Sequence, residues 1–234
     1  MVKPSEAVTV WLQGGLGNQL FQLNAGFLAS AVAQTELRLS SINFFRDPKR
    51  KFEIGQVAVG IERESTIQSL WHGIPYENGR PRASTRRGGL RVTTVISEAR
   101  AGDLLVGFFQ DQKSLTGGTE NTKTRLRGVS LSPRAQAVQR MARDRVVVHV
   151  RRGDYVTLPS ARESFGALST EYYRGALESL EVSPRDAVFF SDDPAYVQEE
   201  FDVPRDSIIG ASDLSSSLET LLVMGAARDI VISN

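Results

Sequence analysis

Two adjacent arginines, Arg151 and Arg152, directly follow an apolar, β-branched run at Val146–Val150. The guanidinium fork matches the oxygens of a phosphate group and does not lose its proton in proteins. Two such forks at the end of a buried strand predict a site that holds a diphosphate without a metal ion. The alternative is an ion pair with Asp154 or with another acidic side chain at the surface.

Two carboxylates follow another apolar run, Ala187–Phe190, within the cluster Ser191, Asp192 and Asp193. Asp193 stands directly before Pro194, the arrangement typical of a helix N-cap followed by proline at the first helical position. We therefore expect Asp193 to cap a helix. Asp192 is then left to face a ligand, and a carboxylate that accepts two N–H bonds suits the amide and amino edge of guanine.

A histidine and a serine complete this group. His149 alternates with Arg151 along the same run, and Ser233 follows the last apolar run of the chain. Ligands of a parallel sheet bind outside the carboxyl ends of its strands, so we expect all these side chains on one rim. The alternative for His149 is a hydrogen-bonded core residue without a ligand.

A glycine-rich turn, Gly14–Asn18, follows the first expected strand and opens a helix. Gly15 and Gly17 resemble part of a dinucleotide fingerprint. However, Leu20 occupies the third glycine position, and Ser40 ends the next strand where an acid would hold a ribose. NAD is therefore a poor fit. Two interpretations remain: backbone N–H groups that face an anion at a helix N-terminus, or a tight turn packed on the sheet.

The elements that position these residues alternate between strand and helix. In the second half of the chain this order predicts a parallel sheet with right-handed crossovers. The first half opens with a strand, a glycine turn, a helix and a strand, which starts another α/β unit. The polar stretch Leu115–Lys123 is interpreted as a linker. We therefore expect two Rossmann-like α/β domains, at residues 1–125 and 126–234.

The apolar periodicity sets the bounds of the expected elements. Strands are expected at Ala7–Gln13, Glu36–Ser40, Ile54–Val59, Asp103–Phe109, Val146–Val150, Ala187–Phe190, Ser207–Ile209 and Asp229–Ile232. Helices are expected at Gln19–Gln34, Ser132–Arg143, Thr170–Leu180, Pro194–Phe201 and Leu218–Ala227, the last opened by a capping box formed by Ser216 and Glu219.

Composition excludes several functions. The 234 residues include 28 Lys and Arg against 27 Asp and Glu, a net charge of +1, which argues against nucleic-acid binding through bulk charge. The absence of cysteine excludes disulfides and thiolate sites, and two histidines exclude a multi-histidine metal site. The run Ala7–Leu12 is too short for a signal peptide and no segment is long enough to span a membrane, so we expect a soluble, cytoplasmic protein.

Six motifs occur in the order found in bacterial α-1,2-fucosyltransferases, the galactoside 2-α-L-fucosyltransferases of glycosyltransferase family 11, and the chain resembles that family along its length. The block HVRRGDY is the most specific of the six. The motifs are GGLGNQLFQ (Gly14–Gln22), GFFQD (Gly107–Asp111), VHVRRGDY (Val148–Tyr155), LSTEYY (Leu168–Tyr173), FFSDDP (Phe189–Pro194) and LETLLVMGAARDIVISN (Leu218–Asn234).

The resemblance implies a GT-B glycosyltransferase that moves L-fucose from GDP-β-L-fucose to O2 of a galactoside with inversion, and that needs no metal or cofactor. Residues 126–234 would bind the donor, and residues 1–125 would face the acceptor. The implied catalytic residues are Arg151 at the β-phosphate, Arg152 in support and Asp154 as a candidate general base. The implied donor-binding residues are His149, Asp192, Ser191, Gly15, Gly17, Asn18 and Ser233.

One departure and three further expectations accompany the resemblance. The family continues beyond ISN into a segment STFSWW, so we expect either a shortened chain that lacks its final elements or an incomplete site. In both cases we expect weak GDP binding and little transfer activity. The basic stretch Arg80–Arg91 is interpreted as a solvated loop, or as a peripheral contact with a membrane that carries the acceptor. The rival functions are a degenerate paralogue that binds a nucleotide sugar without transfer, and a methyltransferase or oxidoreductase that uses the glycine loop.

Overall fold

The computed structural model describes residues 6–47, 49–64, 76–77, 80–81, 91–115, 119–153, 156 and 166–233. The chain divides into two compact units, residues 1–129 and residues 130–234. The division expected after residue 125 falls inside helix α5 (Thr119–Arg127). Within the described ranges, no helix is both long enough and apolar enough to span a bilayer.

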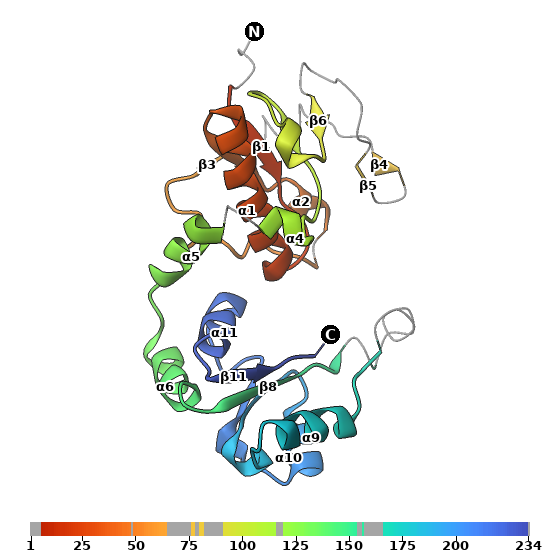
Figure 1. Ribbon diagram of the computed structural model, residues 1–234, viewed down its shortest axis with the longest axis vertical. Helices are drawn as coiled ribbons and strands as arrows, with labels where there is room; N and C mark the ends of the chain where they lie inside the picture. Colours follow the sequence, from red (N-terminus) through yellow and green to blue (C-terminus); the bar gives the residue numbers. More distant parts are fainter. Residues whose placement is uncertain are drawn as a thin grey trace. The chain divides into compact units, whose positions relative to one another are not determined.

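The first unit is built on a five-stranded sheet in the order β3-β2-β1-β7-β6, in which all neighbouring strands are parallel. Figure 1 labels its strands β1, β3 and β6. The central strand β1 (Val8–Trp11) is buried along its whole length, as its β-branched sequence predicts. Helix α1 (Leu16–Ala33) packs beside it. The other strands are β2 (Leu37–Ser40), β3 (Glu62–Arg63), β6 (Val92–Thr93) and β7 (Leu104–Leu105), with a separate antiparallel pair, β4 (Tyr76–Glu77) and β5 (Arg80–Pro81).

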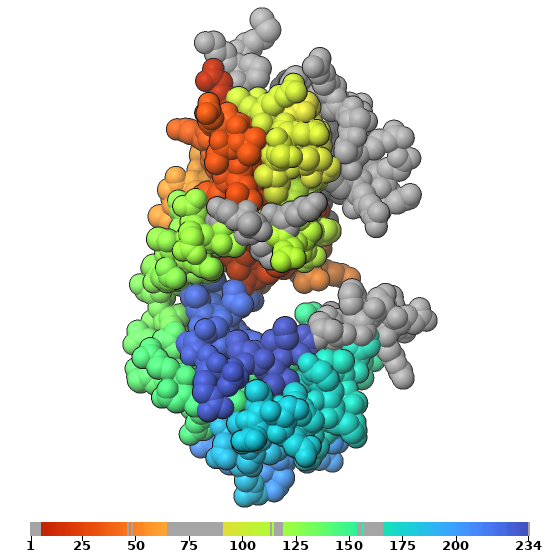
Figure 2. Space-filling view, viewed as in Figure 1, coloured from red at the N-terminus to blue at the C-terminus, as the bar shows by residue number. Residues whose placement is uncertain are grey.

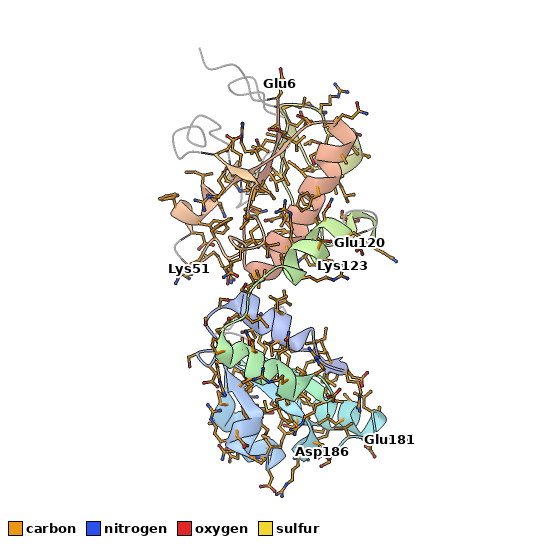
Figure 3. All side chains as sticks on the ribbon, turned by 90° about the vertical axis from the view of Figure 1, so that its left-hand side faces the viewer. Glu6, Lys51, Glu120, Lys123, Glu181 and Asp186 are labelled. Atoms are coloured by element: carbon orange, nitrogen blue, oxygen red, sulfur yellow. The ribbon has the colours of Figure 1, made fainter. Side chains whose placement is uncertain are left out.

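Short helices complete this unit. They are α2 (Asn43–Arg46), η1 (Ile96–Glu98), α4 (Gln112–Leu115) and α5. Two expectations are wrong here. Ile54–Val59 forms turns in place of a strand, because Ile54 and Val57 are buried by a tight turn closed through the Ile54 carbonyl. The linker expected at Leu115–Lys123 is helical from Thr119 onward, where Lys123 pairs with Glu120 at 3.1 Å on the surface (Figure 3).

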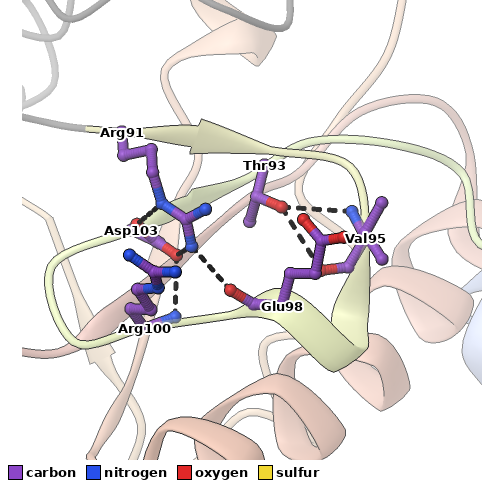
Figure 4. A network of polar contacts seen from close by, with 6 residues as sticks. All are labelled: Arg91, Thr93, Val95, Glu98, Arg100 and Asp103. Carbon is purple, nitrogen blue, oxygen red and sulfur yellow. Dashed lines mark hydrogen bonds and ion pairs between the residues drawn. The ribbon is translucent and has the colours of Figure 1, made fainter.

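A buried ion pair fixes the edge of the first sheet. The Asp103 carboxylate, only 2% exposed, accepts hydrogen bonds from Arg91 Nε at 2.9 Å and Arg91 Nη2 at 2.5 Å (Figure 4). The same carboxylate accepts the Arg100 backbone N–H at 2.7 Å, and Arg91 also donates to the Glu98 carbonyl at 2.6 Å. These contacts tie β6, η1 and β7 together, and the adjacent carboxylate raises the pKa of Arg91.

The second unit contains a four-stranded parallel sheet in the order β10-β9-β8-β11. This is the order 3-2-1-4 that begins a Rossmann sheet. The strands are β8 (Val146–Val150), β9 (Val188–Ser191), β10 (Ile208–Gly210) and β11 (Asp229–Val231). The helices are α6 (Pro133–Ala142), α9 (Thr170–Ser179), η2 (Pro184–Asp186), α10 (Pro194–Phe201), η3 (Arg205–Ser207) and α11 (Ser217–Met224).

Helices cover both faces of this sheet. Val146, Val148 and Val150 of β8 pack with side chains of α9 and α10, whereas Val147 packs with side chains of α6 and α11. Figures 1 and 2 show α6 and α11 next to each other. The predicted alternation of strands and helices and the α/β class of two Rossmann-like units are therefore confirmed.

The predicted helix starts in the second unit are also confirmed. The hydroxyl of Ser132 accepts the Ala135 N–H, and the hydroxyl of Ser216 accepts the Glu219 N–H. The buried Glu219 carboxylate goes further, because it accepts the backbone N–H groups of Ser132 at 2.6 Å and of Ser215 at 2.9 Å. One carboxylate thus holds the first turns of α6 and α11 together.

Candidate functional site

The candidate site of the second unit lies at the point in the sheet where the order of the strands reverses. From β8 the chain continues to β9 and β10 on one side, and it then returns to place β11 on the other side of β8. Such a switch point, outside the carboxyl ends of the strands, is where α/β sheets bind ligands. Because Val150 is paired with Ser191, the residues that follow β8 and β9 emerge next to each other.

His149 and Ser233 lie on the two sides of this switch point. Ser233 Oγ is 3.1 Å from His149 Nδ1, and Ser233 is 9% exposed. Burial lowers the pKa of His149, the nearby charge of Arg151 lowers it further, and Asp192 opposes them. The imidazole is therefore kept neutral at pH 7 and offers one acceptor and one donor nitrogen. The alternative interpretation, that His149 is hydrogen-bonded within the protein, is therefore correct for its Nδ1 atom.

Asp192 holds the backbone that follows β8. Its Oδ1 accepts the Arg152 N–H at 2.8 Å. The other carboxylate oxygen, Asp192 Oδ2, packs against Gly153, because a Cβ built on that glycine would stand 2.7 Å from it. The residue is exposed, but one of its oxygens is already engaged with the protein, which the sequence did not indicate.

The side chain of Arg152 is held by two groups of α10. Its Nε lies 3.3 Å from Asp193 Oδ2, and its Cζ lies 3.6 Å from the centroid of the Tyr196 ring. Asp193 also caps α10 as predicted, because its Oδ1 accepts the Tyr196 N–H at 3.2 Å. For Arg152, the alternative of an ion pair with an acidic side chain is therefore confirmed, although the acid is Asp193.

The other expected site residues of the second unit differ in their surroundings. Arg151 is half-buried beside His149, and its charge acts on the His149 pKa. Ser191 is buried, and its hydroxyl accepts the Asp193 N–H at 2.9 Å. Asp154, the candidate general base, lies outside the described residues, as do Asn234 and most of the basic stretch Arg80–Arg91.

The glycine loop of the first unit lies at the corresponding switch point, between β1 and β7. Gly14 adopts a φ of +77°, and a Cβ there would stand 2.3 Å from Asn18 Nδ2. Gly15 is the N-cap of α1. At Gly17 no atom of the described residues, apart from its chain neighbours and the backbone of its own helix, lies within 4 Å of a Cβ position. The Asn18 carboxamide accepts a hydrogen bond from Gln110 Nε2 at 2.7 Å, which joins the GGLGN and GFFQD motifs.

Two glutamines that the sequence reasoning missed hold this loop from inside. Gln19 donates to the carbonyls of Gly14 at 3.0 Å and Lys51 at 2.7 Å, and it accepts the Glu53 N–H at 2.9 Å. Gln22 accepts the Gln13 N–H at 2.9 Å and donates to the Gly107 carbonyl at 3.1 Å. Both are completely buried. The signal was present, because the two amides stand three residues apart beside the apolar stripe of an amphipathic helix.

Comparison with known proteins identifies the relatives of this chain. Residues 120–234 match the family model described as glycosyl transferase family 11. The chain is 25% identical to the O-antigen biosynthesis glycosyltransferase WbnK of Escherichia coli over 263 aligned positions, which cover 95% of this chain and 85% of that protein. It is 26% identical to an alpha-1,2-colitosyltransferase of Escherichia coli, over 80% of this chain and 69% of the relative. The solved structure of the fucosyltransferase NodZ from Bradyrhizobium aligns with 94% of this chain and 82% of its own, at 14% identity and a TM-score of 0.44.

Proposed function

On the premise that this chain carries a glycosyl transferase family 11 domain at residues 120–234, we propose that it is an inverting fucosyltransferase. The donor is GDP-β-L-fucose, the acceptor is O2 of a galactoside, and the product belongs to a surface polysaccharide. The second unit binds the donor, and the first unit faces the acceptor. The observation that carries the proposal is the arginine loop, Arg151–Gly153, which emerges at the switch point of the sheet between His149 and Asp192.

The chemistry requires a group that accepts charge from the departing nucleotide. The acceptor oxygen forms a bond to the anomeric carbon while the bond from that carbon to the β-phosphate oxygen breaks. The electron pair of the broken bond goes to GDP, and the acceptor hydroxyl gives up its proton to a base, for which we propose Asp154. In this proposal the guanidinium of Arg151 meets the charge that develops on the β-phosphate oxygen.

The remaining residues orient the nucleotide. A neutral His149, fixed through Ser233, presents its other ring nitrogen to the nucleoside. Asp192 keeps one carboxylate oxygen at the rim of the sheet and uses the other to shape the arginine loop. No metal is needed if the arginines balance the diphosphate charge.

The test replaces Arg151 by alanine and measures transfer from labelled GDP-fucose to a panel of galactosides. Loss of a donor aimed at developing charge lowers turnover by about a hundredfold or more. Arg140→Ala is the matched control, because Arg140 is an exposed arginine on α6, away from the switch point. An Arg151→Ala protein that keeps a quarter of the wild-type turnover would exclude the assigned role.

A second donor deserves the same assay, because one of the relatives is a colitosyltransferase. The panel therefore includes a nucleotide-activated colitose beside GDP-fucose. Transfer of colitose but not fucose would change the donor sugar and leave the role of the arginine loop unchanged. Binding of GDP without transfer of either sugar would favour a paralogue that has lost transfer activity.

A further inference from the structure

The aromatic ring of Tyr196 stacks against the guanidinium group of Arg152. Its ring centroid lies 3.6 Å from Arg152 Cζ, a short distance for a guanidinium over an aromatic face. Asp193 Oδ2 reaches the Nε edge of the same group at 3.3 Å. The Arg152 side chain is 24% exposed, so it is partly withdrawn from water while it is held in this way.

The tyrosine is itself fixed at two points. Its hydroxyl lies 2.7 Å from Thr170 Oγ1, and that threonine also contacts Glu200 Oε2 at 3.2 Å. Its backbone N–H is bound by the N-cap Asp193. Thr170 begins α9 and Tyr196 stands in the first turn of α10, so the ring is set by the two helices that cover one face of the sheet.

Stacking and anion binding use different parts of a guanidinium. The aromatic ring occupies its face, whereas its five N–H donors point outward in its plane. A ring beneath Arg152 therefore restricts the orientation of the plane without competing for the donors in it. The contact to Asp193 at Nε restricts the remaining rotation of the group.

We propose that Tyr196 is a positioning residue that orients the Arg152 guanidinium for the diphosphate of the nucleotide. This inference rests on the proposed function, because it assumes that the arginine loop receives that diphosphate. Tyr196 itself does not touch the ligand. Its aromatic face, more than its hydroxyl, carries the effect, since the face is the part of the ring that meets Arg152.

The test measures GDP affinity by calorimetry for the full chain and three variants. Tyr196→Leu keeps apolar bulk but removes the aromatic face, and we expect GDP to bind about three- to tenfold more weakly. Tyr196→Phe keeps the face and loses the contact to Thr170, so it recovers most of the wild-type affinity. Phe52→Leu is the matched control, because it removes a ring beneath Arg63 in the first unit, at 4.6 Å.

A double-substitution cycle separates positioning from folding. Arg152→Lys keeps the positive charge but has no planar face to stack, so adding Tyr196→Leu to it should change the affinity by less than about twofold. The melting temperature of each variant is measured beside its affinity. If Tyr196→Leu does not fold, Tyr196→Met, which also fills the space without an aromatic face, takes its place in the same measurements.

The outcomes separate this inference from the proposed function. A wild-type chain that shows no GDP binding up to millimolar concentration contradicts the proposed function itself. Wild-type affinity in Tyr196→Leu, with GDP binding intact, overturns only the positioning role. Equal losses in Tyr196→Phe and Tyr196→Leu also overturn it, because they assign the effect to the hydroxyl.

Discussion

Asp192 Oδ2 lies 2.7 Å from the point where a β-carbon on Gly153 would stand, while Asp192 Oδ1 binds the N–H of Arg152. The glycine of the arginine loop is thus matched to a carboxylate on the neighbouring strand end. The loop follows β8 and the carboxylate follows β9, so the contact is fixed by the pairing of these two strands.

Gly153→Ala should therefore disturb the loop without unfolding the unit. The new methyl group displaces the Asp192 carboxylate and breaks its bond to the Arg152 N–H, a loss of about 1 kcal/mol in the free energy of unfolding. We expect GDP affinity to fall by about tenfold because the arginine loop is displaced. A tenfold fall corresponds to a loss of about 1.4 kcal/mol in binding free energy. Gly175→Ala is the control and should be neutral or slightly stabilising, because Gly175 is exposed in the middle of α9 and, among the described residues outside its own helix backbone, none lies within 4 Å of a Cβ there. Equal GDP affinity in the two variants would contradict the contact.

Glu219 should make the stability of the second unit depend on pH. Burial raises the pKa of Glu219, but the hydrogen bonds from Ser132 and Ser215 outweigh burial and leave the pKa below its ordinary 4.5. The folded state therefore favours the ionised carboxylate. Its contribution is present in full above the unfolded-state pKa and is lost as the pH falls through the folded-state value.

Glu219→Gln removes this ionised group, and we expect a loss of about 1–3 kcal/mol in the free energy of unfolding at pH 7. The difference between variant and wild type should shrink as the pH is lowered below 4.5. Urea unfolding at several pH values measures both effects. Glu199→Gln, an exposed residue of α10, is the control. A constant difference across the pH series would show that charge is not involved.

Loss of the buried ion pair of Arg91 and Asp103 in the first unit should lower the free energy of unfolding more than loss of an exposed ion pair in the second unit. Asp103→Ala removes a buried acceptor of three hydrogen bonds, and we expect about 3 kcal/mol of destabilisation. Arg228→Ala breaks the exposed pair with Asp229 and should cost about 0.5 kcal/mol or less. Chemical unfolding of the two variants makes the comparison, and equal losses would contradict the structural role of Asp103.

His149 should remain uncharged at and above the ordinary histidine pKa. Its pKa is lowered by burial first and by the Arg151 charge second, so the folded state favours the neutral ring. The associated stability is present above the unfolded-state pKa of 6.5 and is lost as the pH falls below it. The chain has 2 histidines, His72 and His149, so a proton NMR titration gives two imidazole signals and His149→Gln assigns them. A His149 midpoint above 6.5 would contradict this expectation.

The second sheet was predictable from the sequence because its strands are continuous apolar runs and its helices carry their own start signals. Two helix starts can be predicted from a cap residue followed by proline, namely Ser132 before Pro133 and Asp193 before Pro194. The strand at Val146–Val150 is found with the expected bounds. Local rules were sufficient because each of these features depends on near neighbours along the chain.

The missed features depend on partners far apart in the sequence. Tyr196 contacts Arg152 because β9, which leads into α10, pairs with β8, and no local pattern predicts that contact. Gln19 and Gln22 are buried because distant loops supply their hydrogen-bond partners. The apolar run near Ile54 suggested a strand, but its side chains are buried by a turn, because burial alone does not distinguish the two.

The two oxygens of Asp193 serve different ends, one starting a helix and the other pairing with an arginine. Asparagine caps helices as well as aspartate does, yet it carries no charge. A single base change in the codon turns Asp193 into asparagine. This substitution keeps the helix cap and removes the charge that pairs with Arg152. The start of α10 and the hold on Arg152 can therefore be separated by one substitution.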